Sequence, residues 1–322
     1  MDLKQLEALA SIADHGSFSA AAAALGTVQS NVSGRIARLE TELDTSLVNR
    51  SNGTLTDDGE IVVARARRVL LELEAIMSDV VSAHSEVAGT VRVGMIGTTG
   101  RWLIPHLFAL VTERHPRVIL RITEGTTTTL EPQLLMGQLD FAVLTTPVQA
   151  PELAVQPLFD EDLVLVVRND HPFASIYANQ AIELDALEGI DLLLPLQGTA
   201  LRDEIDEALV PAGITLHASM ELDGLRTLAS LVFDGYGPAI LPATAVSEHL
   251  RDRFTLLALA GVPRRHVGLV SRRHGLPSAP SRVVRELLVE VTSDESSHPS
   301  GIHAVPSEPL DRAGSRRSSG RR

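Results

Sequence analysis

Side chains suited to contact another molecule are concentrated in residues 29–43. Four apolar residues recur there at intervals of four, three and four, which places them on one face of a helix. They are Val32, Ile36, Leu39 and Leu43. The opposite side carries mostly small or hydrogen-bonding residues, namely Ser30, Ser33, Gly34, Ala37 and Arg38. Such a helix is suited to the major groove of DNA, although an ordinary amphipathic surface helix shows the same pattern.

The neighbouring residues predict a winged helix-turn-helix around this segment. We expect a first helix at residues 2–15 and a short alanine-rich helix from Phe18, followed by a tight turn at residues 25–27. The Asn52-Gly53 pair separates two strand-like runs, and Asn-Gly in that position predicts a hairpin. Arg50 lies at the start of this wing, where it can reach a phosphate or the minor groove.

A second group of polar residues follows two predicted strands of the C-terminal part. Gly97-Thr98-Thr99-Gly100 follows the first strand, and Gly125-Thr126-Thr127-Thr128-Thr129 follows the second. Open α/β sheets bind ligands beyond the carboxyl ends of their strands, where hydroxyls and helix N-termini suit a small anion such as a carboxylate. The simpler alternative is that these threonines only cap helices.

Residues typical of catalysis are missing from the sequence. There is no G-x-S-x-G, H-E-x-x-H or P-loop motif, and no cysteine is present. The spacing Gly94-x-x-Gly97-x-x-Gly100 differs from a dinucleotide loop, and the histidines are scattered. We therefore expect no enzyme activity, no cofactor and no metal site.

A long helix is predicted between the two parts, with a linker at residues 59–89. Apolar residues recur there at alternating steps of four and three, as in a coiled-coil seam. They are Val62, Ala66, Val69, Leu73, Ile76 and Val80. The seam predicts a dimerisation helix, and the alternative is a helix that lies against its own domain.

Strands alternate with helices through residues 90–292, which predicts an α/β domain. We expect strands at 91–96, 118–123, 141–144, 163–167, 191–194, 216–221, 239–241 and 267–271. We expect helices at 102–115, 129–137, 201–212, 225–233 and 281–292. Residues 293–322 lose this periodicity and are rich in Ser, Pro, Gly and Arg, which predicts a disordered tail.

The charge balance limits the kind of DNA binding. The net charge is −13, and residues 1–89 contain seven basic against thirteen acidic residues, a balance of −6. This argues against a nonspecific nucleic-acid binder, because phosphate contacts usually dominate affinity. We expect few phosphate ion pairs and a shallow dependence of affinity on salt.

An ordered pattern of residues through the N-terminal part resembles the LysR-type transcriptional regulators. The matching residues are Leu6, Ile12, Gly16-Ser17-Phe18, Ala21-Ala22, Leu25, Gln29-Ser30, Val32-Ser33, Ile36, Leu39-Glu40, Leu43, Leu47, Arg50, Leu55-Thr56 and Gly59. Val28 stands where the family often has a capping serine, so we expect Thr27 to cap the helix. Gly34 stands where the family often has arginine, and Arg35 follows it.

The resemblance implies both the architecture and the contact residues. It implies an N-terminal winged helix-turn-helix at 1–58, a linker helix that pairs with a partner, and a two-lobed α/β domain at 90–292 like periplasmic solute-binding proteins. The DNA-binding residues expected on this basis are Gln29, Ser30, Asn31, Ser33, Gly34, Arg35, Arg38 and Arg50. The effector-binding residues expected are Thr98, Thr99, Gly100, Thr127, Thr128, Gln197 and Arg202. Arg202 could instead pair with Asp206, four residues later on the same helix.

Together these patterns predict a transcriptional regulator that binds double-stranded DNA and responds to a small, anionic effector. We expect a homodimer or homotetramer. We expect it in the cytoplasm, because residues 1–4 begin a charged amphipathic helix and not a signal peptide, and no apolar run is long enough to span a bilayer. The alternative is a solute-binding component without a DNA-binding role.

Overall fold

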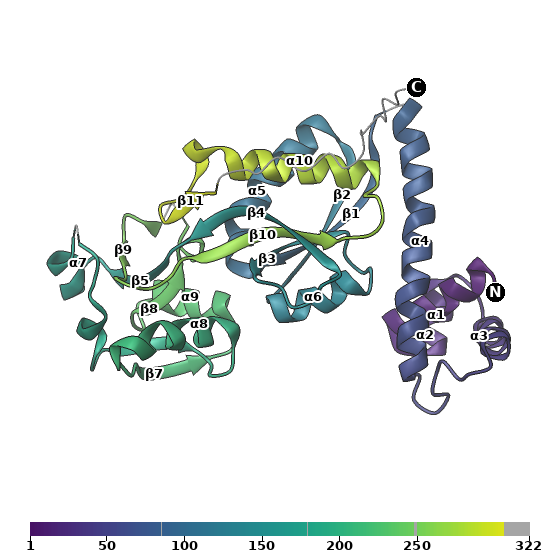
Figure 1. Ribbon diagram of the computed structural model, residues 1–322, viewed down its shortest axis with the longest axis horizontal. Coiled ribbons are helices and arrows are strands. Elements are labelled where there is room, and N and C mark those ends of the chain that lie inside the picture. The colour runs from purple at the N-terminus through teal and green to yellow at the C-terminus, as the bar shows by residue number, and fades with distance from the viewer. Residues whose placement is uncertain (85, 179, 248–249, 306–322) are drawn as a thin grey trace, which may run out of the picture.

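The computed structural model describes residues 1–84, 86–178, 180–247 and 250–305. Figure 1 shows a small helical domain at one end of a long helix, α4, one α/β lobe beside that helix, and a second α/β lobe on the far side of the first. Among the described residues, no helix combines the length and apolar character needed to cross a membrane.

The N-terminal domain is the predicted helix-turn-helix with a short wing. Its helices are α1 (Leu3–His15), α2 (Phe18–Ala24) and α3 (Gln29–Leu43). Asp2 caps α1, and Gly16 ends it with a positive φ. Val32, Ile36 and Leu39 are buried as predicted, whereas Leu43 lies partly exposed at the end of α3. The wing is reduced to one antiparallel bridge, between Val48 and Leu55.

Helix α4 (Asp57–His84) belongs to two environments. Near its start, Val63 and Ala66 are buried against the N-terminal domain, and Arg67 forms an ion pair with Asp14 of α1. Gly59 is required there, because a Cβ atom would lie 2.0 Å from the carbonyl oxygen of Leu47. Of the predicted seam residues, Val62 therefore packs against the N-terminal core and Ala66 is buried, whereas Val69, Ile76 and Val80 are exposed.

The first lobe is built on a six-stranded sheet in the order β11-β4-β10-β3-β1-β2. Its elements are β1 (Ala88–Ile96), α5 (Gly97–Arg114), β2 (Arg117–Gly125), α6 (Thr127–Leu135), β3 (Phe141–Thr146), β4 (Leu153–Glu161), β10 (Arg265–Arg272), α10 (Ala279–Ser293) and β11 (Ile302–Ala304). Strand β1 is parallel to β2 and β3, whereas β10 is antiparallel to β3 and β4. The core includes Met95, Trp102, Phe141 and Phe159.

The second lobe is built on a five-stranded sheet in the order β7-β6-β8-β5-β9. Its elements are β5 (Leu163–Arg168), α7 (Pro172–Ile176), β6 (Asp191–Pro195), α8 (Ala200–Leu209), β7 (His217–Leu222), α9 (Leu225–Phe233), β8 (Ala239–Pro242), the short 3-10 helix η3 (Ala243–Ala245) and β9 (Phe254–Ala258). The apolar run of β5 is buried, but it is antiparallel to β8 and β9, so its apolar sequence does not indicate a parallel strand.

The chain passes from the first sheet to the second at Asp162 and returns between β9 and β10. Strands β4, β9 and β11 were not predicted, and α5 begins five residues before its predicted start. Strand β11 pairs with β4, and Ile302 is buried. The predicted tail is therefore ordered up to residue 305, and residues 306–322 lie outside the described part of the chain.

Candidate functional site

The polar side of α3 is open to solvent. Gln29, Ser30, Asn31 and Arg38 are exposed, and a Cβ atom on Gly34 would meet nothing within 4 Å. Val28 occupies the N-cap position and offers no side-chain hydrogen bond. The prediction that Thr27 caps the helix is wrong, because its hydroxyl accepts a hydrogen bond from the Asn31 side chain at 3.0 Å and not from a backbone N–H. The first turn of α3 therefore keeps backbone donors without a side-chain cap.

The three predicted DNA-binding arginines differ in their contacts. Within the described residues, Arg35 has no hydrogen-bond or ion-pair partner, and Arg38 uses only Nε, which donates to the Gly34 carbonyl at 3.2 Å. Arg50 instead lies over α3, where it donates to Glu40 at 2.8 Å and to Ser33 Oγ at 3.5 Å. Glu40 also accepts a hydrogen bond from the Leu47 backbone at 2.9 Å, so this ion pair ties the wing to α3.

The first turn of α5 contains the Gly-Thr-Thr-Gly segment that was predicted as a ligand loop. Thr98, Thr99 and Gly100 are buried, and no side chain caps the N-terminus of α5, where Ile96 is the N-cap residue. The hydroxyl of Thr99 is fully buried, and in the described part of the chain it has no hydrogen-bond partner. Leaving a buried hydroxyl unpaired costs about 1–3 kcal/mol.

The N-terminus of α6 is different, because a side chain caps it and the Thr127 hydroxyl has a partner. Thr126 caps this helix by accepting from Thr129, in a reciprocal capping box. The Thr127 hydroxyl donates to the Thr145 carbonyl at 3.4 Å and accepts from the Thr145 N–H at 3.2 Å. Thr128 is exposed and shares a hydrogen bond with Thr126. For Thr126 and Thr129, the capping alternative therefore describes the structure.

The two remaining predicted effector residues lie in the second lobe. Gln197 is exposed in the turn between β6 and α8. Arg202 is buried and bonded within its own lobe: its guanidinium donates to Asp206 at 2.9 Å and to Glu221 at 2.5 Å. The alternative left open by the sequence, a pair with Asp206, is present. The guanidinium of Arg202 is therefore engaged with carboxylates of the protein itself.

The two lobes meet where α5 packs against α9 and η3, and we call this region the lobe junction. Charged side chains join the lobes there. Arg226 of α9 forms an ion pair with Glu124 at the end of β2. Arg101 of α5 donates to Ser247 at 3.1 Å in the second lobe.

Arg265 is the most connected residue of the lobe junction, and sequence reasoning missed it. It donates to Glu161 at 3.1 Å and to Thr145 at 3.1 Å in the first lobe, and to Glu204 of α8 at 2.9 Å in the second lobe. Glu161 is completely buried and also accepts from the Thr244 backbone at 2.9 Å. Because these partners lie 61 to 120 residues from Arg265 in sequence, no local pattern could have identified the network.

Family models match both parts of the chain. Residues 3–60 match the model described as "Bacterial regulatory helix-turn-helix protein, lysR family", and residues 84–293 match "LysR substrate binding domain". These boundaries fall close to the structural division between the N-terminal domain with α4 and the two lobes.

Curated proteins and solved structures give the same assignment. The chain is 33% identical to a "Probable hydrogen peroxide-inducible genes activator" of Streptomyces viridosporus, over 91% of this chain and 97% of that protein. It is 32% identical to the "DNA-binding transcriptional dual regulator OxyR" of Escherichia coli, over 90% and 94%. A full-length OxyR from Pseudomonas aeruginosa, with one cysteine replaced by aspartate, superposes with a TM-score of 0.75 at 28% identity, over 96% of this chain and 99% of that one. The chain therefore belongs to the LysR family, as a DNA-binding transcription regulator with an effector-binding domain.

Proposed function

We propose that this regulator acts in the cytoplasm as a homodimer or homotetramer and that a small carboxylate bound at the lobe junction controls its contact with DNA. In this proposal α3 reads the half-sites of an interrupted inverted repeat, about 34 Å or a multiple of that distance apart. The effector contacts assigned are Thr98, Thr99, Gly100, Thr127, Thr128 and Gln197. Arg202 is left out because its donors are engaged with Asp206 and Glu221.

The observation that carries the effector site is the start of α5. Its N-terminus has no side-chain cap, and the Thr99 hydroxyl beside it is buried without a partner in the described residues. A helix N-terminus favours a negative charge, and a carboxylate would accept hydrogen bonds from backbone N–H groups and from this hydroxyl. In the form described here the lobes are in contact at this point, so the ligand would enter as they separate and would then alter their closure.

A thiol-based response is excluded for this chain. Several relatives are named as hydrogen peroxide-inducible activators, but none of the 322 residues is a cysteine. Disulfide formation and sulfenic acid chemistry both require a cysteine sulfur. Reversible ligand binding is a mechanism that remains open to a regulator of this architecture.

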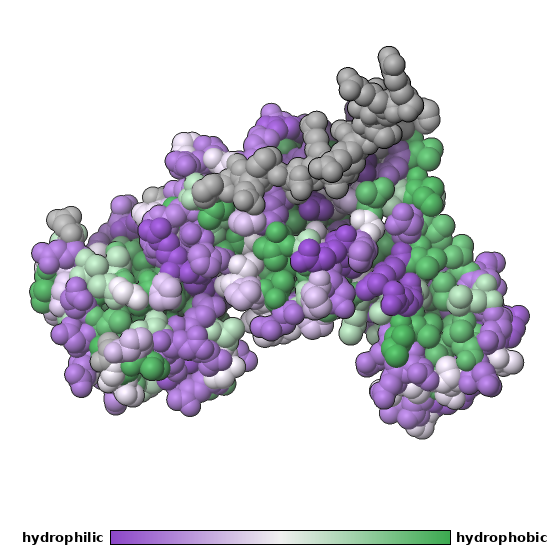
Figure 2. All heavy atoms as spheres, viewed as in Figure 1, coloured by the Kyte–Doolittle hydropathy of each residue, from purple (hydrophilic) through white to green (hydrophobic). Residues whose placement is uncertain are grey.

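The exposed part of α4 supports the proposed dimer. Val69, Ile76, Met77 and Val80 are between 44% and 73% exposed. In Figure 2, hydrophobic surface follows the side of α4 that faces away from the lobes. A continuous apolar strip of this kind is typical of a protein–protein contact, and pairing with a second α4 would cover it.

Footprinting would test the DNA-reading part of the proposal. We expect the purified protein to protect a dyad in the DNA upstream of its own gene or of a divergent neighbour, and Ser33→Ala and Arg38→Ala to lose this protection at protein concentrations at which the wild type just gives it. Arg253→Ala is the charge-matched control, because Arg253 lies on the second lobe next to Phe254. Loss of protection in the control, or none with the wild type at low salt, would contradict the assignment of α3.

Thermal-shift screening of small carboxylates would test the effector site separately. A true effector should stabilise the wild type and alter the footprint, and Thr99→Val should lose the stabilisation while folding normally, because the hydroxyl has no partner to lose. Hydrogen peroxide should leave the footprint unchanged. A ligand that stabilises Thr99→Val equally well would place the effector elsewhere.

A further inference from the structure

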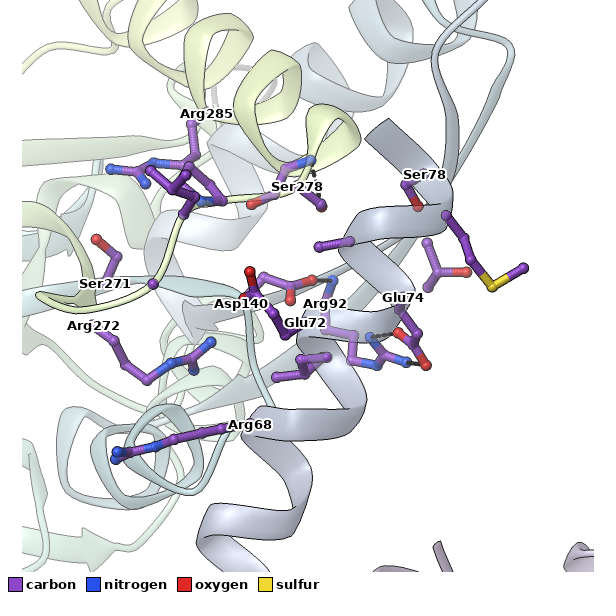
Figure 3. Close-up of a pocket in the computed structure, with 18 of the residues that line it drawn as sticks. Arg68, Glu72, Glu74, Ser78, Arg92, Asp140, Ser271, Arg272, Ser278 and Arg285 are labelled. Carbon is purple, nitrogen blue, oxygen red and sulfur yellow. Dashed lines mark hydrogen bonds and ion pairs between the residues drawn. The ribbon is translucent and has the colours of Figure 1, made fainter. Parts of the chain in front are cut away.

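A cavity lies outside the lobe junction, between α4 and the first lobe. Its volume is about 550 Å³, within the range of about 300–1,000 Å³ that small-molecule pockets usually have. Figure 3 shows Arg68 projecting from α4 and Arg272 and Arg285 on the opposite, effector-domain side. We call this cavity the linker pocket.

Basic side chains dominate the wall of the linker pocket. Five arginines line it: Arg68, Arg92, Arg121, Arg272 and Arg285. Three acidic residues also line it: Glu72, Glu74 and Asp140. Arg92 contacts two of them, because its guanidinium pairs with Glu74 at 3.1 Å and its backbone N–H donates to Asp140 at 2.7 Å. The remaining four arginines have no carboxylate within ion-pair distance among the described residues.

These four arginines are incompletely satisfied. Arg272 donates only to backbone carbonyls, of Leu134 at 2.7 Å and Leu139 at 2.8 Å. Arg68 donates at 3.4 Å to the Leu135 carbonyl, and its Nε atom is buried without a partner in the part of the chain that is described. Arg285 is half-buried on α10 and, like Arg121, makes no hydrogen bond or ion pair with any described residue.

Partial burial makes the charges of Arg272 and Arg285 costly without a counter-charge. Desolvation lowers the pKa of the Arg285 guanidinium and also lowers that of Arg272, where Arg68 adds repulsion and Asp140 opposes it. An anion in the pocket would supply the missing charge through paired N–H donors, which is the strongest kind of hydrogen bond that arginine makes.

We propose that the linker pocket is a second ligand site, for a small molecule with a multivalent anionic group such as a phosphate ester or a polycarboxylate. The site differs from the lobe junction in position and in charge, because four of its five arginines have no carboxylate partner among the described residues. Its ligand would touch α4 and the first lobe together, since Arg68 belongs to one and Arg272 and Arg285 belong to the other.

Occupancy of this site would couple the effector domain to the DNA-binding domain. Polar contacts already join α4 to the first lobe on both sides of the pocket: Asp79 of α4 accepts from the Ala279 N–H at 2.7 Å, and Arg68 reaches Leu135. A ligand between these contacts would stabilise one orientation of α4 relative to the lobe.

Calorimetric titration of the full-length protein with pyrophosphate and with citrate, at constant ionic strength set by sodium chloride, would test the site. We expect saturable binding of at least one probe, one per chain, and at least a tenfold loss of affinity in Arg285→Gln. Preference for pyrophosphate or for citrate distinguishes a phosphate ligand from a polycarboxylate. Arg114→Gln is the matched control, because Arg114 is a surface residue paired with Glu290.

Three outcomes would overturn the proposal: no heat above dilution with either probe, equal weakening in both variants, or undiminished binding in Arg285→Gln. Arg285 is the residue of choice because it has no described partner, so its replacement leaves the fold intact, and a thermal melt verifies this. Hydrogen exchange provides a second readout. The bound anion should slow exchange of the α4 amides from Arg68 to Ser78 in the wild type and not in Arg285→Gln.

Discussion

Arginines line both the lobe junction and the linker pocket, but Arg226 and Arg265 of the lobe junction have counter-charges, whereas four of the five arginines of the linker pocket have none among the described residues. Arg226 and Arg265 pair with Glu124, Glu161 and Glu204, and these pairs join parts of the same chain. In the linker pocket Arg272 and Arg285 face a cavity without a carboxylate partner among the described residues. A paired arginine stabilises the protein, whereas an unpaired one in a cavity is available to a ligand. The same residue type should therefore respond oppositely to mutation in the two regions.

The largest effect is expected from Arg265→Ala. It leaves the carboxylate of Glu161 buried without its cation, and removing one partner of a buried pair costs about 3–5 kcal/mol of unfolding free energy. Urea denaturation followed by tryptophan fluorescence would measure it, because Trp102 is the one tryptophan and lies in the core of the first lobe. Arg264→Ala is the control: its pair with Asp162 is half exposed, so the loss should stay below about 1 kcal/mol. Equal losses of unfolding free energy in Arg265→Ala and Arg264→Ala would contradict the prediction that the buried pair matters more than the exposed one.

The DNA-binding helix offers the same contrast on a smaller scale. Arg38 has free terminal nitrogens, whereas Arg50 is held by Glu40. Arg38→Ala should weaken DNA binding about tenfold and lower the slope of log affinity against log salt by about 0.9, the value for one lost phosphate contact. Arg50→Ala should change the slope less. Fluorescence anisotropy over a range of salt concentrations measures both, and a larger change in Arg50→Ala would reverse the assignment.

A third prediction concerns Asp140, a half-buried carboxylate of the linker pocket. Burial raises its pKa, against the opposing effects of the Arg92 N–H and the charges of Arg92 and Arg272. The Asp140 carboxyl group therefore loses its proton at a lower pH in the unfolded chain than in the folded protein. As a result, its contribution to the free energy of unfolding falls as the pH rises from the ordinary carboxyl pKa through the raised one. Asp140→Asn keeps an acceptor for the Arg92 N–H and should gain stability over the wild type across that window. Melting temperatures of both proteins at about pH 4 and pH 7 would measure this gain. The same difference between variant and wild type at both pH values would contradict the prediction.

The smallest effect is expected from Arg285→Gln. With no described partner to lose, the variant should differ from the wild type by less than about 0.5 kcal/mol in unfolding free energy. The urea assay used for Arg265→Ala measures this too. A loss above about 1 kcal/mol would mean that Arg285 supports the fold, and the two groups of arginines would then no longer differ.

The elements predicted correctly from sequence are those with a regular apolar period or a well-defined end. Helix α1 begins after Asp2 and ends at Gly16, and α9 has the predicted bounds. Strand β4 was missed because residues 153–161 mix polar and apolar residues and contain Pro157, although pairing with β10 and β11 makes it a strand. The start of α5 was missed because glycine and threonine are weak helix formers, and tertiary packing overrides that preference.

The candidate sites also differ in how far the sequence could predict them. The polar side of α3 could be predicted, because a single helix positions it. Arg202 was assigned to the effector, yet the structure pairs it with Asp206 and Glu221. Neither Arg265 nor the linker pocket was predicted, because their residues come from distant parts of the chain. Such sites depend on tertiary packing, which periodicity and motifs do not report.

The 28 residues of α4 make it a lever between the effector domain and the DNA. At 1.5 Å per residue the helix is about 42 Å long. A rotation of only about 5° at the C-terminal end of α4 would therefore displace its N-terminal end by about 3.7 Å, slightly more than the rise of one base pair, about 3.4 Å. A change too small to alter the fold of either lobe is thus large enough to move a recognition helix from one base pair to the next.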